Sequence, residues 1–126
     1  MAKEYLYQAI ASDSPVVRGA VVGAIAKVAQ EEPKDELFEI LVKSLTDVDV
    51  DVRCEAAALG NLAYKPAIPN LIELLDRGDG ETRRAAALSL MKVGDRAAIE
   101  PLQAALEKES EAAIQGVIKL AISQIK

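Results

Sequence analysis

An internal repeat with an uneven period is the feature that most constrains what this chain can fold into. A polar residue is followed four positions later by arginine, or once by isoleucine, at Ser14 and Arg18, Asp49 and Arg53, Asp79 and Arg83, and Ser110 and Ile114. The polar residues are 35, 30 and 31 positions apart, and the aliphatic residues Ile10, Leu45, Leu75 and Leu106 share these spacings. A period of this length is typical of stacked repeats that bury a common core.

Each repeat reads as a pair of helices. The first helix, here called A, begins at the polar residue, which can cap the first turn, and Pro15 favours such a start. The second helix, B, carries apolar residues at i, i+4, i+7 and i+8 counted back from the closing aliphatic, which is one face of an amphipathic helix. These stripes are Leu37, Phe38, Leu41 and Leu45; Ala67, Ile68, Leu71 and Leu75; and Ala98, Ile99, Leu102 and Leu106.

The repeat register predicts a single all-α domain over residues 1–126. Its units are 1–13, 14–48, 49–78, 79–109 and 110–126, where the first is an unpaired B helix (3–10) and the last an unpaired A helix (111–125). About eight helices result, and no strand is expected. The alternation in 47–52 would suit a strand, but the register makes Asp49 a helix cap instead.

Two irregularities can be placed. The second repeat has one residue fewer between Arg53 and the small residue Gly60, which predicts a kink or an early end of its A helix near 56–60. The first repeat has four extra residues around 29–34, which predicts a longer loop between its two helices.

Residues 52–60 (VRCEAAALG) and 82–106 (TRRAAALSLMKVGDRAAIEPLQAAL) resemble the HEAT-like repeats of phycobilisome lyase subunits. The resemblance implies a right-handed α-solenoid of helical hairpins with the B helices lining the concave side. It also implies that an aspartate and an arginine six positions apart link neighbouring repeats, which Asp47 and Arg53 match. Arg18 and Arg83 take the arginine's place in other repeats without that aspartate, so we predict a partial polar ladder centred on the second repeat.

Composition excludes several function classes. The chain has no histidine, which removes histidine-based nucleophile activation and histidine metal ligands, and its single cysteine cannot form an intrachain disulfide. Neither a signal peptide nor a long apolar span is recognisable, so we expect a cytoplasmic protein that does not enter a membrane. A net charge of −5 disfavours binding to nucleic-acid phosphates. We therefore predict no catalytic residues, no cofactor and no metal.

Two local motifs have a functional and a structural interpretation. Asp47-x-Asp-x-Asp opens like a calcium loop, but Val52 and Ala58 stand where that loop needs glycine and glutamate, so helix capping is the better interpretation. Cys54 follows Arg53 and could in principle be an activated thiol or hold a bilin transiently. With no histidine to assist it, a structural role is favoured.

The predicted function is non-catalytic binding of another protein along the concave side. The B-helix positions that point away from the apolar stripe form an acidic strip, although an ordinary solvated face would look the same. The candidate contact residues are Tyr5, Gln8, Glu36, Glu39, Ile40, Lys43, Asn70, Glu73 and Glu100. The last helix, with Leu120 off its apolar stripe, is a candidate surface for self-association.

Two alternatives remain open at this stage. The resemblance allows a role as one subunit of a lyase that attaches or removes a bilin. HEAT-like alkylpurine DNA glycosylases show that related solenoids can bind DNA, but they need a cationic concave surface with aromatic residues at the lesion, whereas the predicted face of this chain is an acidic strip.

Overall fold

Helices make up the regular secondary structure of the computed structural model, which describes residues 8–77 and 79–125. The α-helices are α2 (Pro15–Glu31), α3 (Asp35–Ser44), α4 (Val50–Ala56), α5 (Ile68–Arg77), α6 (Gly80–Val93), α7 (Ile99–Lys108) and α8 (Ala112–Gln124). Three short 3₁₀ helices are η1 (Ala57–Gly60), η2 (Lys65–Ala67) and η3 (Arg96–Ala98). Of the expected opening helix, residues 8–10 are helical, and the remainder lies outside the described residues.

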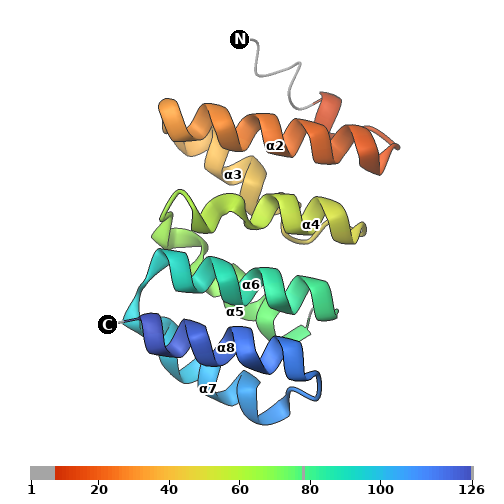
Figure 1. Ribbon diagram of the computed structural model, residues 1–126. Helices are drawn as coiled ribbons and strands as arrows, with labels where there is room; N and C mark the ends of the chain where they lie inside the picture. Colours follow the sequence, from red (N-terminus) through yellow and green to blue (C-terminus); the bar gives the residue numbers. More distant parts are fainter. Residues whose placement is uncertain (1–7, 78, 126) are drawn as a thin grey trace.

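The helices form two layers (Figure 1). One layer, the A face, consists of α2, α4, α6 and α8, which pack side by side in chain order; the other, the B face, consists of α3, α5 and α7. Contacts between α2 and α3, α5 and α6, and α7 and α8 join the two layers. The predicted all-α solenoid is confirmed, because each hairpin buries its apolar side against the next one.

Three of the four expected A-helix starts are confirmed. The side chains of Ser14, Asp49 and Asp79 each accept a hydrogen bond from the backbone amide three residues later, at 3.4, 3.1 and 2.8 Å. This satisfies amides that have no partner inside the helix. The capping interpretation of the Asp47-x-Asp-x-Asp motif is thereby confirmed at Asp49, and the strand alternative for 47–52 is wrong because α4 begins at Val50.

The fourth start, expected at Ser110, is wrong. Helix α8 begins at Ala112, and the buried carboxylate of Glu109 accepts the amide of Glu111 at 3.1 Å. The same bond joins the Asp49 amide to the Asp47 carboxylate before α4, so the start of the last A helix keeps this arrangement one residue later in the repeat. The repeat register of the last unit is accordingly shifted by one residue.

The second A helix ends early, as predicted. Its α-helical part stops at Ala56, and the chain continues as the 3₁₀ helix η1 to Gly60. A 3₁₀ turn uses fewer residues for the same length of axis, so it absorbs the residue that this repeat lacks. Figure 1 shows the A layer continuing across this irregularity.

The predicted longer loop in the first repeat is wrong. Helix α2 has 17 residues where α6 has 14, and only 32–34 separate α2 from α3. The extra residues extend the helix because 26–31 contain neither proline nor glycine, and Pro33 follows only after the helix has ended.

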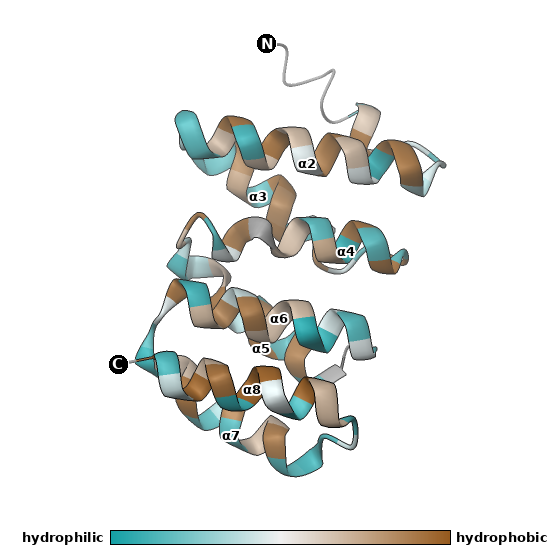
Figure 2. Cartoon of the chain, in the orientation of Figure 1, coloured by the Kyte–Doolittle hydropathy of each residue, from teal (hydrophilic) through white to brown (hydrophobic). Residues whose placement is uncertain are grey.

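Aliphatic side chains of both layers form the core. Leu41, Leu45, Leu71 and Leu102 from the predicted B stripes have no exposed surface or almost none, whereas Leu106 is half-buried. Hydrophobic and hydrophilic residues alternate around each helix in Figure 2, as expected for helices that pack on one side. Two of the few aromatic residues, Phe38 and Tyr64, stack with their ring centroids 4.2 Å apart. This stack joins α3 to the segment that follows η1.

Candidate functional site

A row of arginine–carboxylate bonds links each repeat to the next. Arg18 on α2 donates through Nε and Nη2 to both carboxylate oxygens of Asp47, at 2.9 and 3.1 Å. Its Nη1 donates to the backbone carbonyl of Ser12, six residues earlier, at 2.7 Å. The paired geometry matches a planar guanidinium to a carboxylate and fixes one hairpin against its neighbour.

The next two repeats use the same arginine with different acceptors. Arg53 donates to the carbonyl of Asp47 at 2.7 Å and, across the seam, to Thr82 Oγ1 and Asp79 Oδ2, both at 3.1 Å. Arg83 bonds both carboxylate oxygens of Glu109 at 2.8 and 3.1 Å, and Glu111 at 3.1 Å.

The predicted partial ladder is therefore wrong, since bonds cross all three seams. Asp47 does not pair its carboxylate with Arg53, as expected from the six-residue spacing, but with Arg18 of the preceding repeat. Repeats that lack an aspartate at that position recruit Asp79 or Glu109 instead. In the last repeat Gln115, and not Ile114, takes the arginine's place and donates to the Glu109 carbonyl at 2.6 Å.

The ladder lowers the pKa of its carboxylates and so makes stability depend on pH. Burial opposes ionisation of Asp47, but hydrogen bonds from Arg18 and the Asp49 amide outweigh it and lower its pKa. The hydrogen bond from Arg83 lowers the pKa of Glu109, and that from the Thr82 amide lowers the pKa of Asp79.

We therefore expect the free energy of unfolding to fall on acidification below about pH 4. Carboxylates with a lowered folded-state pKa contribute stability above their unfolded-state pKa, and this contribution disappears as the pH drops through the folded-state value. Urea titrations between pH 7 and pH 3 measure the slope. The Asp47→Asn variant should show a shallower slope than the wild type, and equal slopes would contradict this role of Asp47.

The predicted contact residues of the B face are only partly accessible. Ile40, expected to be exposed, is 5% exposed and belongs to the core. The predicted apolar stripe of this helix contained only four residues. In the structure α3 contacts α2, α4 and η1, so a wider part of its circumference, including Ile40, is buried. Tyr5 lies outside the described residues. The other predicted residues are exposed or half-buried: Gln8, Glu36, Glu39, Lys43, Asn70, Glu73 and Glu100.

Two hollows open along the B layer, each of about 330 Å³. One lies at the ladder end, where Asn70 and Glu73 come together with Asp47, Arg53 and Asp79. The other lies between α5 and α7 and was not predicted. Its lining includes the apolar residues Pro69, Ile72, Pro101 and Ala104 and the acidic residues Glu73 and Asp76.

A larger hollow of about 550 Å³ lies on the A face between α2 and α4. The sequence signal for it is the pair Gly19 and Gly23, whose spacing indicates either close packing between hairpins or a less rigid first A helix. A Cβ atom added to Gly19 would meet Val52 at 3.9 Å, and one added to Gly23 would meet Glu55 at 3.3 Å. The two glycines do approach the next hairpin, and they also leave open space above it.

Cys54 has the environment of an unreactive thiol. Burial and the charges of Glu81, Asp79 and Asp51 raise its pKa, against the weaker opposing effect of Arg53. Since the thiolate is the reactive form, we expect Cys54 to be alkylated by iodoacetamide more slowly than free cysteine at pH 8. Mass spectrometry of timed samples measures the rate. A rate above that of free cysteine would contradict the structural role.

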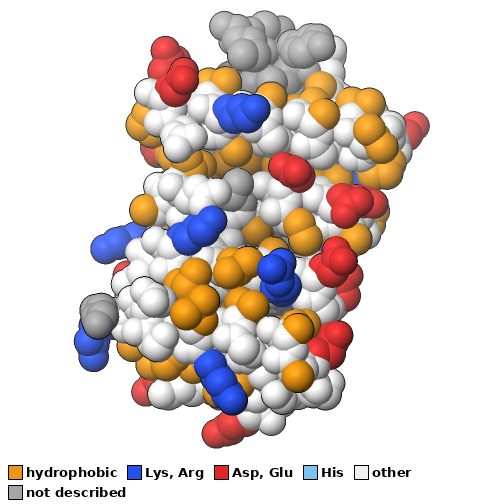
Figure 3. Space-filling model, viewed as in Figure 1, with side chains coloured by type: hydrophobic (Ala, Val, Ile, Leu, Met, Phe, Trp, Pro, Cys, Tyr) orange, Lys and Arg blue, Asp and Glu red, His pale blue; other side chains and the backbone are white. Residues whose placement is uncertain are grey.

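Other kinds of site are not formed by the described part of the chain. Nowhere in residues 8–77 and 79–125 do three His, Cys, Asp or Glu side chains gather closely enough to hold a metal ion. Within the same ranges, no helix combines the length and the apolar character needed to cross a bilayer. Of the two neighbouring arginines, Arg83 belongs to the ladder and Arg84 is exposed. Figure 3 shows Lys and Arg scattered singly over this face, with acidic residues most frequent along its right-hand edge.

Comparisons with known proteins agree with the repeat architecture. A family model described as HEAT repeats matches residues 38–123. A bilin biosynthesis protein, MpeU of Synechococcus sp. (strain WH8020), is 33% identical over 119 residues, which are 93% of this chain and 40% of that protein. The chain thus spans less than half the length of this relative. The crystal structure of an engineered protein is similar with a TM-score of 0.63 and 25% identity, over 97% of this chain and 61% of the other.

Proposed function

Because this chain belongs to the HEAT-repeat family, we propose that it is a non-catalytic module that binds a segment of another protein along the B face. Over residues 8–77 and 79–125 the fold offers an extended surface of exposed helix sides, which suits binding along a face more than chemistry in a deep pocket.

The hollow between α5 and α7 is the observation that carries this proposal. Its lining includes Pro69, Pro101 and Ala104, which can receive an apolar side chain, and Glu73 and Asp76, which contribute carboxylates. Asp76 also accepts a hydrogen bond from Lys108 at 3.2 Å, but both side chains are more than half exposed, so the pair is weak. A segment with an apolar anchor and a neighbouring lysine or arginine fits this hollow.

Peptide selection followed by NMR tests the proposal. A random peptide library is selected on the purified protein, and the selected peptides are titrated into ¹⁵N-labelled protein. We expect enriched peptides to pair an apolar residue with a basic one and to shift the amide signals of α5 and α7.

A matched pair of variants locates the site. Ala104→Arg places a long side chain in the hollow, whereas Gln103→Arg adds the same charge at an exposed neighbouring position that does not line it. We expect Ala104→Arg to weaken peptide binding at least about tenfold and Gln103→Arg to leave it nearly unchanged. Equal binding to both variants would remove the hollow from consideration.

A second candidate function is supported by one comparison. The relative from Synechococcus is named as a bilin biosynthesis protein, and it matches nearly the whole of this chain. We propose as the alternative that the chain is a subunit or relative of a bilin lyase. Biliverdin mixed with the protein and passed over a gel-filtration column tests this directly. Co-elution of visible absorbance with the protein supports the alternative, and free elution of the pigment supports the protein-binding module.

A further inference from the structure

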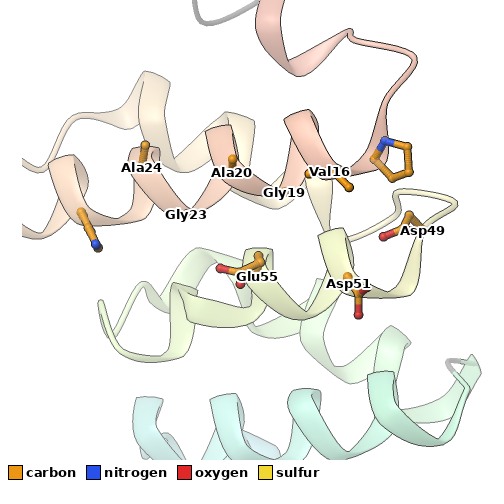
Figure 4. A pocket seen from close by; sticks show the side chains of 10 residues that line it. Val16, Gly19, Ala20, Gly23, Ala24, Asp49, Asp51 and Glu55 are labelled. Carbon is orange, nitrogen blue, oxygen red and sulfur yellow. The ribbon is translucent and has the colours of Figure 1, made fainter.

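The hollow of about 550 Å³ between α2 and α4, called the groove below, is present because α2 carries glycine and alanine residues on that side. The middle of the α2 side of the groove is formed by Gly19, Ala20, Gly23 and Ala24, none of which reaches far from the helix axis, with Pro15 and Val16 at one end and Lys27 at the other. Figure 4 shows these residues along one side of α2, directly above the exposed side of α4. Val16 is 81% exposed, so the groove has an apolar end that lies open to solvent.

The next hollow along the A face is smaller. Gly19 and Gly23 stand one and five positions after the ladder arginine Arg18, and after Arg53 the same places hold Cys54 and Ala58. The hollow between α4 and α6, which Cys54 lines on the equivalent wall, has about 260 Å³, roughly half the volume of the first groove. The contact between α2 and α4 therefore leaves more open space on the A face than the contact between α4 and α6.

The wall opposite α2 is acidic. Asp51 and Glu55 lie one turn apart on α4 and both line the groove, and Figure 4 labels both. Glu55 reaches toward α2, since its Oε2 atom would lie 3.3 Å from a Cβ atom added to Gly23. Both are exposed, and neither forms an ion pair within the described residues. Lys27 lines the other end of the groove, on the last turns of α2. The groove thus combines an apolar floor, two unpaired carboxylates along one wall and a single cation at one end.

We propose that this groove binds an amphipathic α-helix of a partner protein that carries lysine or arginine on successive turns. Small side chains on α2 let a third helix approach closely, in the way that helix-in-groove complexes use an apolar face with charged edges. Basic residues one turn apart on the partner pair with Asp51 and Glu55. Lys27 orients the partner, because an acidic residue or the carboxyl end of the partner helix belongs at that end. This site is on the opposite layer from the B face and is independent of it.

Two synthetic peptides test the charge requirement. One is a helix-forming peptide of about five turns built from Ala, Leu and Lys, and the other has Glu in place of every Lys. Fluorescence anisotropy with labelled peptides measures binding to the full chain at low and high salt. We expect the lysine peptide to bind, binding to weaken with salt, and the glutamate peptide not to bind. Equal binding of both peptides, or no binding of the lysine peptide, overturns the proposal.

Three variants test the location. Ala20→Gln with Ala24→Gln fills the groove with neutral side chains, and Ala113→Gln makes the same change at an exposed position on α8. We expect the first variant to weaken binding of the lysine peptide by about tenfold or more and Ala113→Gln to leave it unchanged. Asp51→Lys with Glu55→Lys should transfer binding to the glutamate peptide. Unchanged binding in the filled groove overturns the proposal.

The B-face variant separates this proposal from the proposed function. Ala104→Arg lies on α7, so it should leave binding of the lysine peptide unchanged. Circular dichroism of each variant verifies that the helices are retained. A loss of binding can then be attributed to the substituted groove and not to unfolding.

Discussion

Replacing Arg83 with methionine should lower the free energy of unfolding by about 3 kcal/mol at pH 7. The Glu109 side chain that it pairs with is only 3% exposed, and the two oxygens of its carboxylate both accept bonds from this guanidinium. Methionine keeps much of the packing of the arginine stem but leaves a buried charge without its cation, and that is the costly part of the change. Urea denaturation followed by far-ultraviolet circular dichroism measures the loss.

The adjacent arginine provides the control. Arg84 is exposed on the same helix, so Arg84→Met should change stability by less than about 0.5 kcal/mol. Adding Glu109→Gln to Arg83→Met should restore part of the loss, since it removes the unpaired charge. If Arg83→Met and Arg84→Met cost the same, the bond between Arg83 and Glu109 contributes nothing net.

The pH dependence of the same variant identifies the cause. In the wild type the hydrogen bond from Arg83 lowers the pKa of Glu109, so its contribution is present at neutral pH and disappears in acid. In Arg83→Met a carboxylate without its guanidinium has a higher pKa, and protonation relieves the penalty. The difference in stability between wild type and variant should therefore shrink as the pH falls from 7 to 4.

The repeat made most of the architecture predictable. Caps at Ser14, Asp49 and Asp79 and the buried B stripes follow from short-range rules, namely which side chains can bond a free amide and which positions share a helix face. The early end of α4 followed from counting residues between two aligned positions, although the sequence does not say whether a helix absorbs a deletion by kinking or by tightening.

Contacts between repeats were harder to predict than the repeats themselves. The ladder depends on which acidic group reaches the arginine of the preceding hairpin, and glutamate at 109 or the cap Asp79 serves as well as an aspartate at 47. The burial of Ile40 depends on how many neighbours α3 has, which is a property of the assembled layers. The groove beside Gly19 also required a partner wall, and α4 lies more than 25 residues further along the chain.

Among the glycines of the described residues, Gly60 approaches a neighbouring repeat most closely. Its replacement should give the second large change in stability. A Cβ atom added there would lie 2.5 Å from Ser89 Cα, 2.8 Å from its Cβ and 2.8 Å from its carbonyl oxygen. Two of these are backbone atoms of α6, so they cannot move away as a flexible side chain would. The hydroxyl of Ser89 also donates to the carbonyl of Ala57, which ties η1 to α6 at the same place. We expect Gly60→Ala to cost about 2 to 3 kcal/mol by forcing the second and third hairpins apart.

A glycine-to-alanine change elsewhere should have the opposite sign. Gly116 is an exposed residue within α8, and a Cβ atom there would meet nothing within 4 Å. Alanine favours the helix over glycine and reduces the freedom of the unfolded chain, so Gly116→Ala should stabilise by about 0.5 to 1 kcal/mol. Parallel urea titrations of the two variants compare the same chemical change in two environments. Loss at Gly60 with gain at Gly116 can arise only if the distance between hairpins, and not helix propensity, requires glycine at position 60. Stabilisation at both positions would mean that the second and third hairpins can move apart at Gly60 without lowering the free energy of unfolding.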